Sequence, residues 1–148
     1  MDIEELLKSL NAHHVEFVII GATAFPIHGY ARATLDIDIF IRAEPQNADR
    51  TLNALRDFGY DTADITVEDL LTRKVLIRQY LVETDIHPFV TGITFDQAWK
   101  NRISGTYGKE KVYYASLDDL IAMKESAGRS KDLEDIKVLK ALQKKRNT

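Results

Sequence analysis

The sequence predicts an α/β (α+β) fold in which a small mixed β-sheet is flanked by helices and the chain ends in a pair of helices. Two observations support this prediction. Short apolar segments rich in β-branched residues alternate with segments of helical periodicity, in the expected order α-β-α-β-α-β-α-β-α-α. No internal repeat, low-complexity tract or linker interrupts the 148 residues, so we expect one domain spanning residues 1–148.

The first elements are expected to be a helix, a buried strand and a second, short helix. Apolar residues at helical spacing predict the first helix: Ile3, Leu6, Leu7 and Leu10. Residues 15–20 are apolar and β-branched, which predicts a buried strand that stops at Gly21. Thr23 is the expected cap of the short helix, which should end at Gly29.

Residues 35–41 have the clearest strand pattern, because apolar side chains alternate strictly with others. One face is expected to carry Leu35, Ile37, Ile39 and Ile41, and the other Asp36, Asp38 and Phe40.

The rest of the chain completes the predicted fold. Helices are expected at 46–58, 95–101, 117–127 and from 130 onward, a helical turn at 66–69, a strand or hairpin at 75–87, and a strand at 111–114. In the last helix, Ser130 is the expected cap and Leu133 the first inward-facing residue.

The composition is that of an ordinary globular protein, with 45% hydrophobic and 29% charged residues. The absence of cysteine excludes disulfides and thiolate metal sites and suits a reducing compartment. The acidic N-terminus lacks the basic region of a signal peptide, and no apolar run reaches the roughly 20 residues of a membrane span. A net charge of -3 disfavours broad DNA binding. We therefore expect a cytoplasmic protein without a membrane partner.

Asp36 and Asp38 are the strongest candidates for a chemical site. Side chains two residues apart in a strand share a face, with Cα atoms roughly 6.5–7 Å apart. Their carboxylates can converge on hard cations, and Mg²⁺ combines one or two protein carboxylates with substrate phosphates and water. A solvated acidic face of an amphipathic strand has the same pattern, so the acid pair alone leaves both interpretations open.

Gly21, Ala22 and Thr23 follow the first buried strand, and thirteen residues separate Ala22 from Asp36. A glycine at such a turn lets backbone amides approach a phosphate, and a following helix N-terminus adds a positive dipole. The Thr23 hydroxyl could bind a phosphate oxygen or simply cap the helix. An ordinary strand-to-helix turn is the alternative interpretation of Gly21.

Together, these segments resemble the signature of the DNA polymerase β-like nucleotidyltransferase superfamily. The resemblance rests on Val-Ile-Ile-Gly-Ala at 18–22 and Asp-Ile-Asp-Ile at 36–39, with the family's spacer length between them. Residues 28–34 resemble the approach to the acids in a small prokaryotic branch related to abortive-infection and toxin–antitoxin nucleotidyltransferases. Residues 117–124 and 128–136 resemble that branch's C-terminal helical motif. The resemblance thus covers both ends of the chain and matches the middle loosely.

The resemblance implies a minimal nucleotidyltransferase fold with three carboxylates, the third on a later strand facing Asp36 and Asp38. Asp85 is the best candidate for this third catalytic and metal-binding acid, and Glu83, on the same predicted face, is the reserve. The three acids would bind Mg²⁺ or Mn²⁺, and Asp85 would take or orient the proton of an acceptor hydroxyl.

The nucleotide-binding residues implied by the resemblance are Gly21, Ala22, Thr23, Arg32, Lys124 and Arg129. Lys124 and Arg129 match basic residues with which the family neutralises a triphosphate. Arg32 could orient a phosphate, or pair with Asp36 or Asp38 when no nucleotide is bound. A surface or salt-bridge role is the alternative for each cation.

The implied reaction transfers a nucleoside monophosphate from an NTP, with ATP expected, to a hydroxyl acceptor, and releases pyrophosphate. The acceptor could be a protein, a tRNA end or a small molecule, and so short a chain could act with a protein partner, for example in a toxin–antitoxin pair. The alternative is an inactive nucleotide-binding or antitoxin-type module, because Ala22 stands where the family usually has Gly or Ser. A metal-dependent glycosyltransferase is less favoured because such enzymes need a larger nucleotide-binding domain. His28 and His87 fall near the site, but their spacing is not that of a zinc site.

Overall fold

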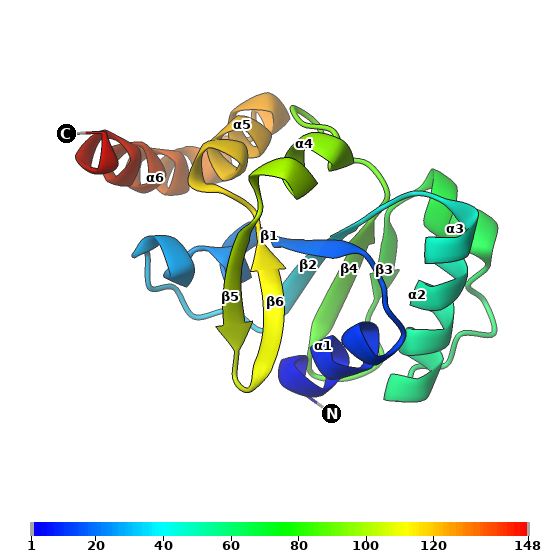
Figure 1. Ribbon diagram of the computed structural model, residues 1–148. Helices are drawn as coiled ribbons and strands as arrows, with labels where there is room; N and C mark the ends of the chain where they lie inside the picture. Colours follow the sequence, from blue (N-terminus) through cyan, green and yellow to red (C-terminus); the bar gives the residue numbers. More distant parts are fainter. Residues whose placement is uncertain (1, 148) are drawn as a thin grey trace.

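A computed structural model of the chain describes residues 2–147 and has a six-stranded mixed sheet with helices around it (Figure 1). The α-helices are α1 (Ile3–Ala12), α2 (Pro45–Phe58), α3 (Val67–Thr72), α4 (Phe95–Asn101), α5 (Leu117–Ala127) and α6 (Leu133–Arg146). The strands are β1 (Phe17–Ile20), β2 (Asp36–Ile41), β3 (Val75–Ile77), β4 (Glu83–His87), β5 (Ile103–Tyr107) and β6 (Glu110–Tyr114). Three short 3-10 helices are η1 (Gly21–Ala24), η2 (Pro26–His28) and η3 (Ser130–Asp132). The predicted fold class, with its C-terminal helical pair, is confirmed.

The strand order in the sheet is β3-β4-β2-β1-β6-β5. Two hairpins, β3–β4 and β5–β6, form the two ends of the sheet, and β1 and β2 are antiparallel neighbours at its centre. The pairings β2–β4 and β1–β6 are parallel, so each hairpin joins the centre through a parallel contact. The β2–β4 pairing matters most for the site, because parallel register fixes which side chains of the two strands lie side by side.

The helices lie in two groups on either side of the sheet (Figure 1): α1, α2 and α3 on one side, and α4, α5 and α6 on the other. The predicted inward face of α1 is confirmed, because all four of its apolar residues are buried: Ile3, Leu6, Leu7 and Leu10. Asp2 caps this helix by accepting a hydrogen bond from the Glu5 amide. Among the described residues, no helix is long and apolar enough to cross a membrane.

Strand β2 follows the predicted alternation but is shorter at its start. Ile37, Ile39 and Ile41 are fully buried, whereas Leu35 is 58% exposed. The prediction that Leu35 faces the core is wrong. Leu35 lies before the first residue of β2 and outside the buried face of the strand. On the acid face, Phe40 is buried by an edge-to-face contact with Phe95 of α4. Helix α4 therefore covers the end of this face that carries Phe40, while the acids at its start stay open.

Strand β5 was not expected from the sequence. Its residues are mostly exposed and include Gly105, which has low strand propensity. The strand forms because Gly108 at φ +59° turns the chain and pairs it with β6. A Cβ at Gly105 would approach Tyr114 and Ile27 to 3.0 Å, so close packing also favours glycine there.

The C-terminal pair begins differently from the prediction. Ser130 does not cap α6 but opens the 3-10 turn η3, and the helix starts at Leu133 without a side-chain cap. Leu133 is 65% exposed, so its predicted inward position is wrong, whereas Leu139 is fully buried. The first turn of α6 instead buries Asp135. In this turn a carboxylate is buried and a leucine is exposed, which indicates that the turn belongs to a polar site.

Candidate functional site

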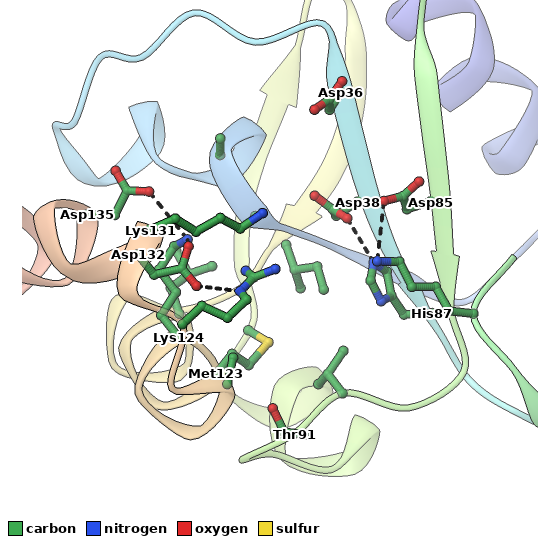
Figure 2. A pocket seen from close by; sticks show the side chains of 18 of the residues that line it. Asp36, Asp38, Asp85, His87, Thr91, Met123, Lys124, Lys131, Asp132 and Asp135 are labelled. Atoms are coloured by element: carbon green, nitrogen blue, oxygen red, sulfur yellow. Dashed lines mark hydrogen bonds and ion pairs between the residues drawn. The ribbon is translucent and has the colours of Figure 1, made fainter. Parts of the chain in front are cut away.

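The parallel register of β2 and β4 brings three potential metal ligands together. Asp38 lies beside Asp85, and Phe40 lies beside His87. One ligand atom each from Asp38, Asp85 and His87 forms a group whose members are all within 4.8 Å of one another. The Nε2 atom of His87 is 2.8 Å from Oδ1 of Asp38 (Figure 2). Two carboxylates and an imidazole thus meet at one point of the sheet.

Asp85 is the most enclosed of these acids, with a side chain that is 16% exposed. Its Oδ1 atom is fully buried and accepts no hydrogen bond. Nη1 of Arg78 is 2.8 Å from that oxygen but does not approach in hydrogen-bonding geometry, so their contact is electrostatic. Nζ of Lys74 lies 3.6 Å from the other carboxylate oxygen. The Asp85 carboxylate raises the pKa of Arg78.

Asp36 lines the same pocket but stands apart from this group. Its side chain is exposed, and its neighbour on β4 is Glu83 rather than Asp85. Figure 2 shows the Asp36 carboxylate at the start of β2, apart from the carboxylates of Asp38 and Asp85. Glu83, the reserve candidate, is half exposed and lies 3.7 Å from Arg78. Of the three predicted acids, the structure brings Asp38 and Asp85 together and leaves Asp36 at the rim.

The turn after β1 borders the Asp38 carboxylate. Gly21 has φ +71°, and a Cβ there would lie 2.5 Å from Oδ2 of Asp38. Glycine is therefore required both by the backbone conformation and by the space that Asp38 occupies. Ala22 lines the pocket beside it. Thr23 caps no helix: its buried hydroxyl donates to the Asp36 carbonyl at 2.8 Å and is not part of the pocket lining.

The opposite wall of the pocket comes from α5, η3 and α6. Asp132 accepts hydrogen bonds from Lys124 at 3.2 Å and Arg129 at 2.7 Å. Burial alone would raise the pKa of Asp132, but these two cations outweigh it and hold the pKa below its ordinary value. Lys124 also lies 3.4 Å from Asp135. Lys124 and Arg129, both predicted nucleotide-binding residues, are thus anchored by buried carboxylates.

Arg32 joins this wall rather than the acids of β2. It pairs with Asp135, which also accepts a hydrogen bond from Tyr30 at 2.9 Å. The expectation that a free Arg32 pairs with Asp36 or Asp38 is wrong, because the buried Asp135 holds the guanidinium on the other wall. Burial favours a higher pKa for Asp135, but Tyr30 and the cations keep it below the ordinary value.

Lys131 also belongs to this wall and differs from its neighbours. Figure 2 shows its side chain extending from η3 toward the β2 side of the pocket. Within residues 2–147 it forms no ion pair or side-chain hydrogen bond, unlike Lys124 and Arg129. Its ammonium group is therefore available to an anion.

The two walls enclose one pocket of about 720 Å³. Five carboxylates line it: Asp36, Asp38, Asp85, Asp132 and Asp135. Six cationic side chains also line it: Arg32, Lys74, Arg78, Lys124, Arg129 and Lys131. Apolar side chains, among them Leu120 and Met123 of α5, form part of the lining. Such a pocket can hold a polyanion with an attached apolar group.

Sequence reasoning did not select His87, Lys131, Lys74 or Arg78. A signal for His87 was present, because it is two residues after Asp85 and strand alternation puts both on one face. Lys131 lies inside the segment that resembles the family's C-terminal motif. Lys74 and Arg78 carry no local signal, because only the β3–β4 hairpin turns them toward Asp85.

The comparisons with known proteins gave one match. The family described as "Nucleotidyltransferase of unknown function (DUF6036)" matches residues 1–145. No curated protein and no solved structure matches the chain.

Proposed function

The chain belongs to the DUF6036 family of nucleotidyltransferases of unknown function, and from this premise we propose the reaction that its pocket carries out. It transfers a nucleoside monophosphate from an NTP to a hydroxyl acceptor and releases pyrophosphate, with a divalent cation. One observation carries the proposal: Asp38 and Asp85 lie side by side on β2 and β4, across a single pocket from the cations of α5 and η3. Acids and cations facing each other suit a metal-bound triphosphate.

The acid wall of the pocket, formed by the carboxylates of β2 and β4, fits a divalent cation. The buried Oδ1 of Asp85 accepts no hydrogen bond and has only the electrostatic contact with Arg78, so a divalent cation would add to its stabilisation. Asp38 adds a second carboxylate of the kind that Mg²⁺ and Mn²⁺ accept as ligands. Asp36, at the rim, is the proposed third ligand on the phosphate side. When bound, the cation would neutralise charge on the phosphates and on the attacking oxygen.

The cationic wall would bind the triphosphate. Lys131 has no partner among the described residues, and Lys124 and Arg129 are fixed in place by Asp132. Fixed cations stabilise developing negative charge at little reorganisation cost. Arg32 is held by Asp135 in the same way, and the backbone amide of Ala22 adds a donor at the turn. The apolar side chains Leu120 and Met123 would contact the base or the sugar.

Asp85 is the proposed group that orients the acceptor hydroxyl and takes its proton, because its side chain is the least exposed of the three acids. Transfer requires no covalent intermediate with the protein, since the two walls position the nucleotide and the acceptor. A protein, a tRNA end and a small molecule are the acceptor classes to be compared.

The test is calorimetric titration of the four NTPs, with and without Mg²⁺, into the wild type and the Asp36→Asn/Asp38→Asn variant. We expect metal-dependent binding of at least one NTP that is lost in the variant. The matched control is Asp49→Asn/Asp64→Asn, which removes the same charge at exposed positions outside this pocket. NTP binding that is equal in the wild type and the site variant would refute the site.

Pyrophosphate release separates catalysis from binding alone. We expect release from the bound NTP once the correct acceptor class is supplied, and no release by the Asp36→Asn/Asp38→Asn variant. Tight NTP binding without release across protein, tRNA and small-molecule acceptors would instead support an inactive nucleotide-binding module acting through a protein partner. Ala22, which stands where the family usually has glycine or serine, is the feature that favours this second candidate.

A further inference from the structure

We propose that His87 is a nitrogen ligand of the metal site and that the site therefore selects a first-row transition ion such as Mn²⁺ over Mg²⁺. This inference rests on the metal site of the proposed function and adds to it a ligand of different chemistry. It concerns which ion binds and through which atom, so it can be tested without any transfer reaction.

The distance between His87 and Asp38 is that of two adjacent ligand atoms around one metal ion. Neighbouring ligand atoms around an octahedral cation, each about 2.1 Å from it, are roughly 3 Å apart. His87 Nε2 and Asp38 Oδ1 are separated by 2.8 Å, which matches that spacing. The full group, with Asp85, spans no more than 4.8 Å, and opposite ligands in such a shell are roughly 4.2 Å apart. Small side-chain rotations would bring all three atoms to one ion.

The surroundings hold the imidazole toward the acids. The side chain of His87 is 12% exposed, and those of Asp38 and Asp85 are 28% and 16% exposed. His87 occupies the last position of β4, where its neighbour on β2 is the buried Phe40. A largely buried imidazole beside two carboxylates, one of which has a buried oxygen that accepts no hydrogen bond, gives a mixed nitrogen and oxygen donor set.

This donor set distinguishes between cations. Mg²⁺ favours oxygen ligands and retains several waters, whereas imidazole is a good ligand for transition ions. Affinity at nitrogen-containing sites rises from Mn²⁺ along the first transition row. An imidazole nitrogen therefore strengthens the binding of transition ions more than the binding of Mg²⁺. The positive neighbours Lys74 and Arg78 weaken binding of both classes of cation, because they lie 3.6 and 2.8 Å from Asp85.

The experiment uses the full chain without nucleotide, and two variants. His87→Gln keeps an amide donor for Asp38 but removes the imidazole nitrogen. His14→Asn removes an imidazole from the turn after α1 and keeps a residue suited to its φ of 57°. Mn²⁺ and Mg²⁺ are titrated separately by calorimetry, and bound Mn²⁺ is examined by electron spin echo spectroscopy for coupling to ¹⁴N. Thermal unfolding establishes that each variant is folded.

We expect ¹⁴N coupling from bound Mn²⁺ in the wild type and in His14→Asn, and its loss in His87→Gln. The ratio of Mn²⁺ to Mg²⁺ affinity should fall by about tenfold or more in His87→Gln, the effect typical of groups that tune a metal site. Absence of ¹⁴N coupling in the wild type, or an unchanged affinity ratio in folded His87→Gln, would overturn the inference and leave His87 as an orienter of Asp38. Nucleotide transfer without ¹⁴N coupling would overturn only this inference. Coupling without NTP binding would support it and count against the transferase.

Discussion

The two walls of the pocket use carboxylates in opposite ways. On β2 and β4, Asp38 and Asp85 are 28% and 16% exposed, and one buried oxygen of Asp85 has no hydrogen bond. On η3 and α6, Asp132 and Asp135 are 5% and 9% exposed and bind cations at hydrogen-bonding distance. On the first wall one buried oxygen has only an electrostatic contact, whereas on the second wall both carboxylates accept hydrogen bonds from cationic side chains. This difference predicts that neutralising an acid impairs binding on one wall and stability on the other.

The largest expected effect is that of Asp38→Asn on metal-dependent NTP binding. We expect a loss of about 100-fold or more, because a ligand at the centre of the acid group disappears. The free energy of unfolding should stay within about 0.5 kcal/mol of the wild type, since the substitution also relieves repulsion between neighbouring carboxylates. Calorimetry and urea unfolding measure the two quantities. A large loss of stability in Asp38→Asn would show that this wall, like the other, depends on its carboxylates for stability.

Asp132→Asn should behave in the reverse way. The substitution leaves Lys124 and Arg129 without their shared carboxylate, and hydrogen bonds to charged groups of this kind contribute about 2 kcal/mol to stability. We expect urea unfolding to show a loss of that size. Glu134→Gln, at an exposed position two residues further along the chain, is the control and should change stability little. Equal stability of Asp132→Asn and wild type would show that the cationic wall is not held by its acids.

Low pH should weaken the interactions in the wall formed by α5, η3 and α6. The pKa values of Asp132 and Asp135 are lower in the folded protein than their ordinary value of about 3.9. The unfolded chain therefore binds more protons in this range, so the contribution to stability is complete above about pH 4 and is lost as the pH falls further. Unfolding free energies of wild type and Asp132→Asn should differ fully at about pH 6 and converge below about pH 4. A difference in unfolding free energy that grows as the pH falls would contradict this prediction.

The smallest effect is expected from Lys131→Gln. Because Lys131 has no partner among residues 2–147, the variant should unfold like the wild type. Its NTP affinity should fall about threefold to tenfold, which corresponds to roughly 1 kcal/mol of lost phosphate contact. Lys137→Gln, an exposed lysine on α6, is the matched control. An undiminished affinity in Lys131→Gln would remove this lysine from the nucleotide site.

Local patterns in the sequence predicted much of the fold. The strict alternation at 35–41 identified the faces of β2, and the spacing of apolar residues identified α1. These signals depend on neighbours along the chain, which a sequence displays directly. Leu133 was misplaced because the turn at η3 changes the phase of the helix after it. Strand β5 was missed because its pairing with β6, rather than its own residues, makes it a strand.

The site was predictable to the extent that its signals were local. Asp36, Asp38 and Gly21 form one short segment pattern, and the structure explains Gly21 by the space that Asp38 needs. The proximity of His87 to Asp38 depends on the register between two strands 49 residues apart in sequence, which no local pattern specifies. The Arg32–Asp135 pair spans 103 residues and was equally hidden.

The Arg32 and Tyr30 contacts to Asp135 have a consequence for biosynthesis. They join a loop near the start of the chain to a helix near its end, across sequence separations of 103 and 105 residues. A ribosome delivers the N-terminal segment first, so β2 and its acids exist before the wall that faces them has been made. The pocket is complete only when α6 has emerged, so a nascent chain displays Asp36, Asp38 and Asp85 before the wall of α5, η3 and α6 faces them. Premature termination before residue 135 would therefore yield a chain that lacks the completed pocket.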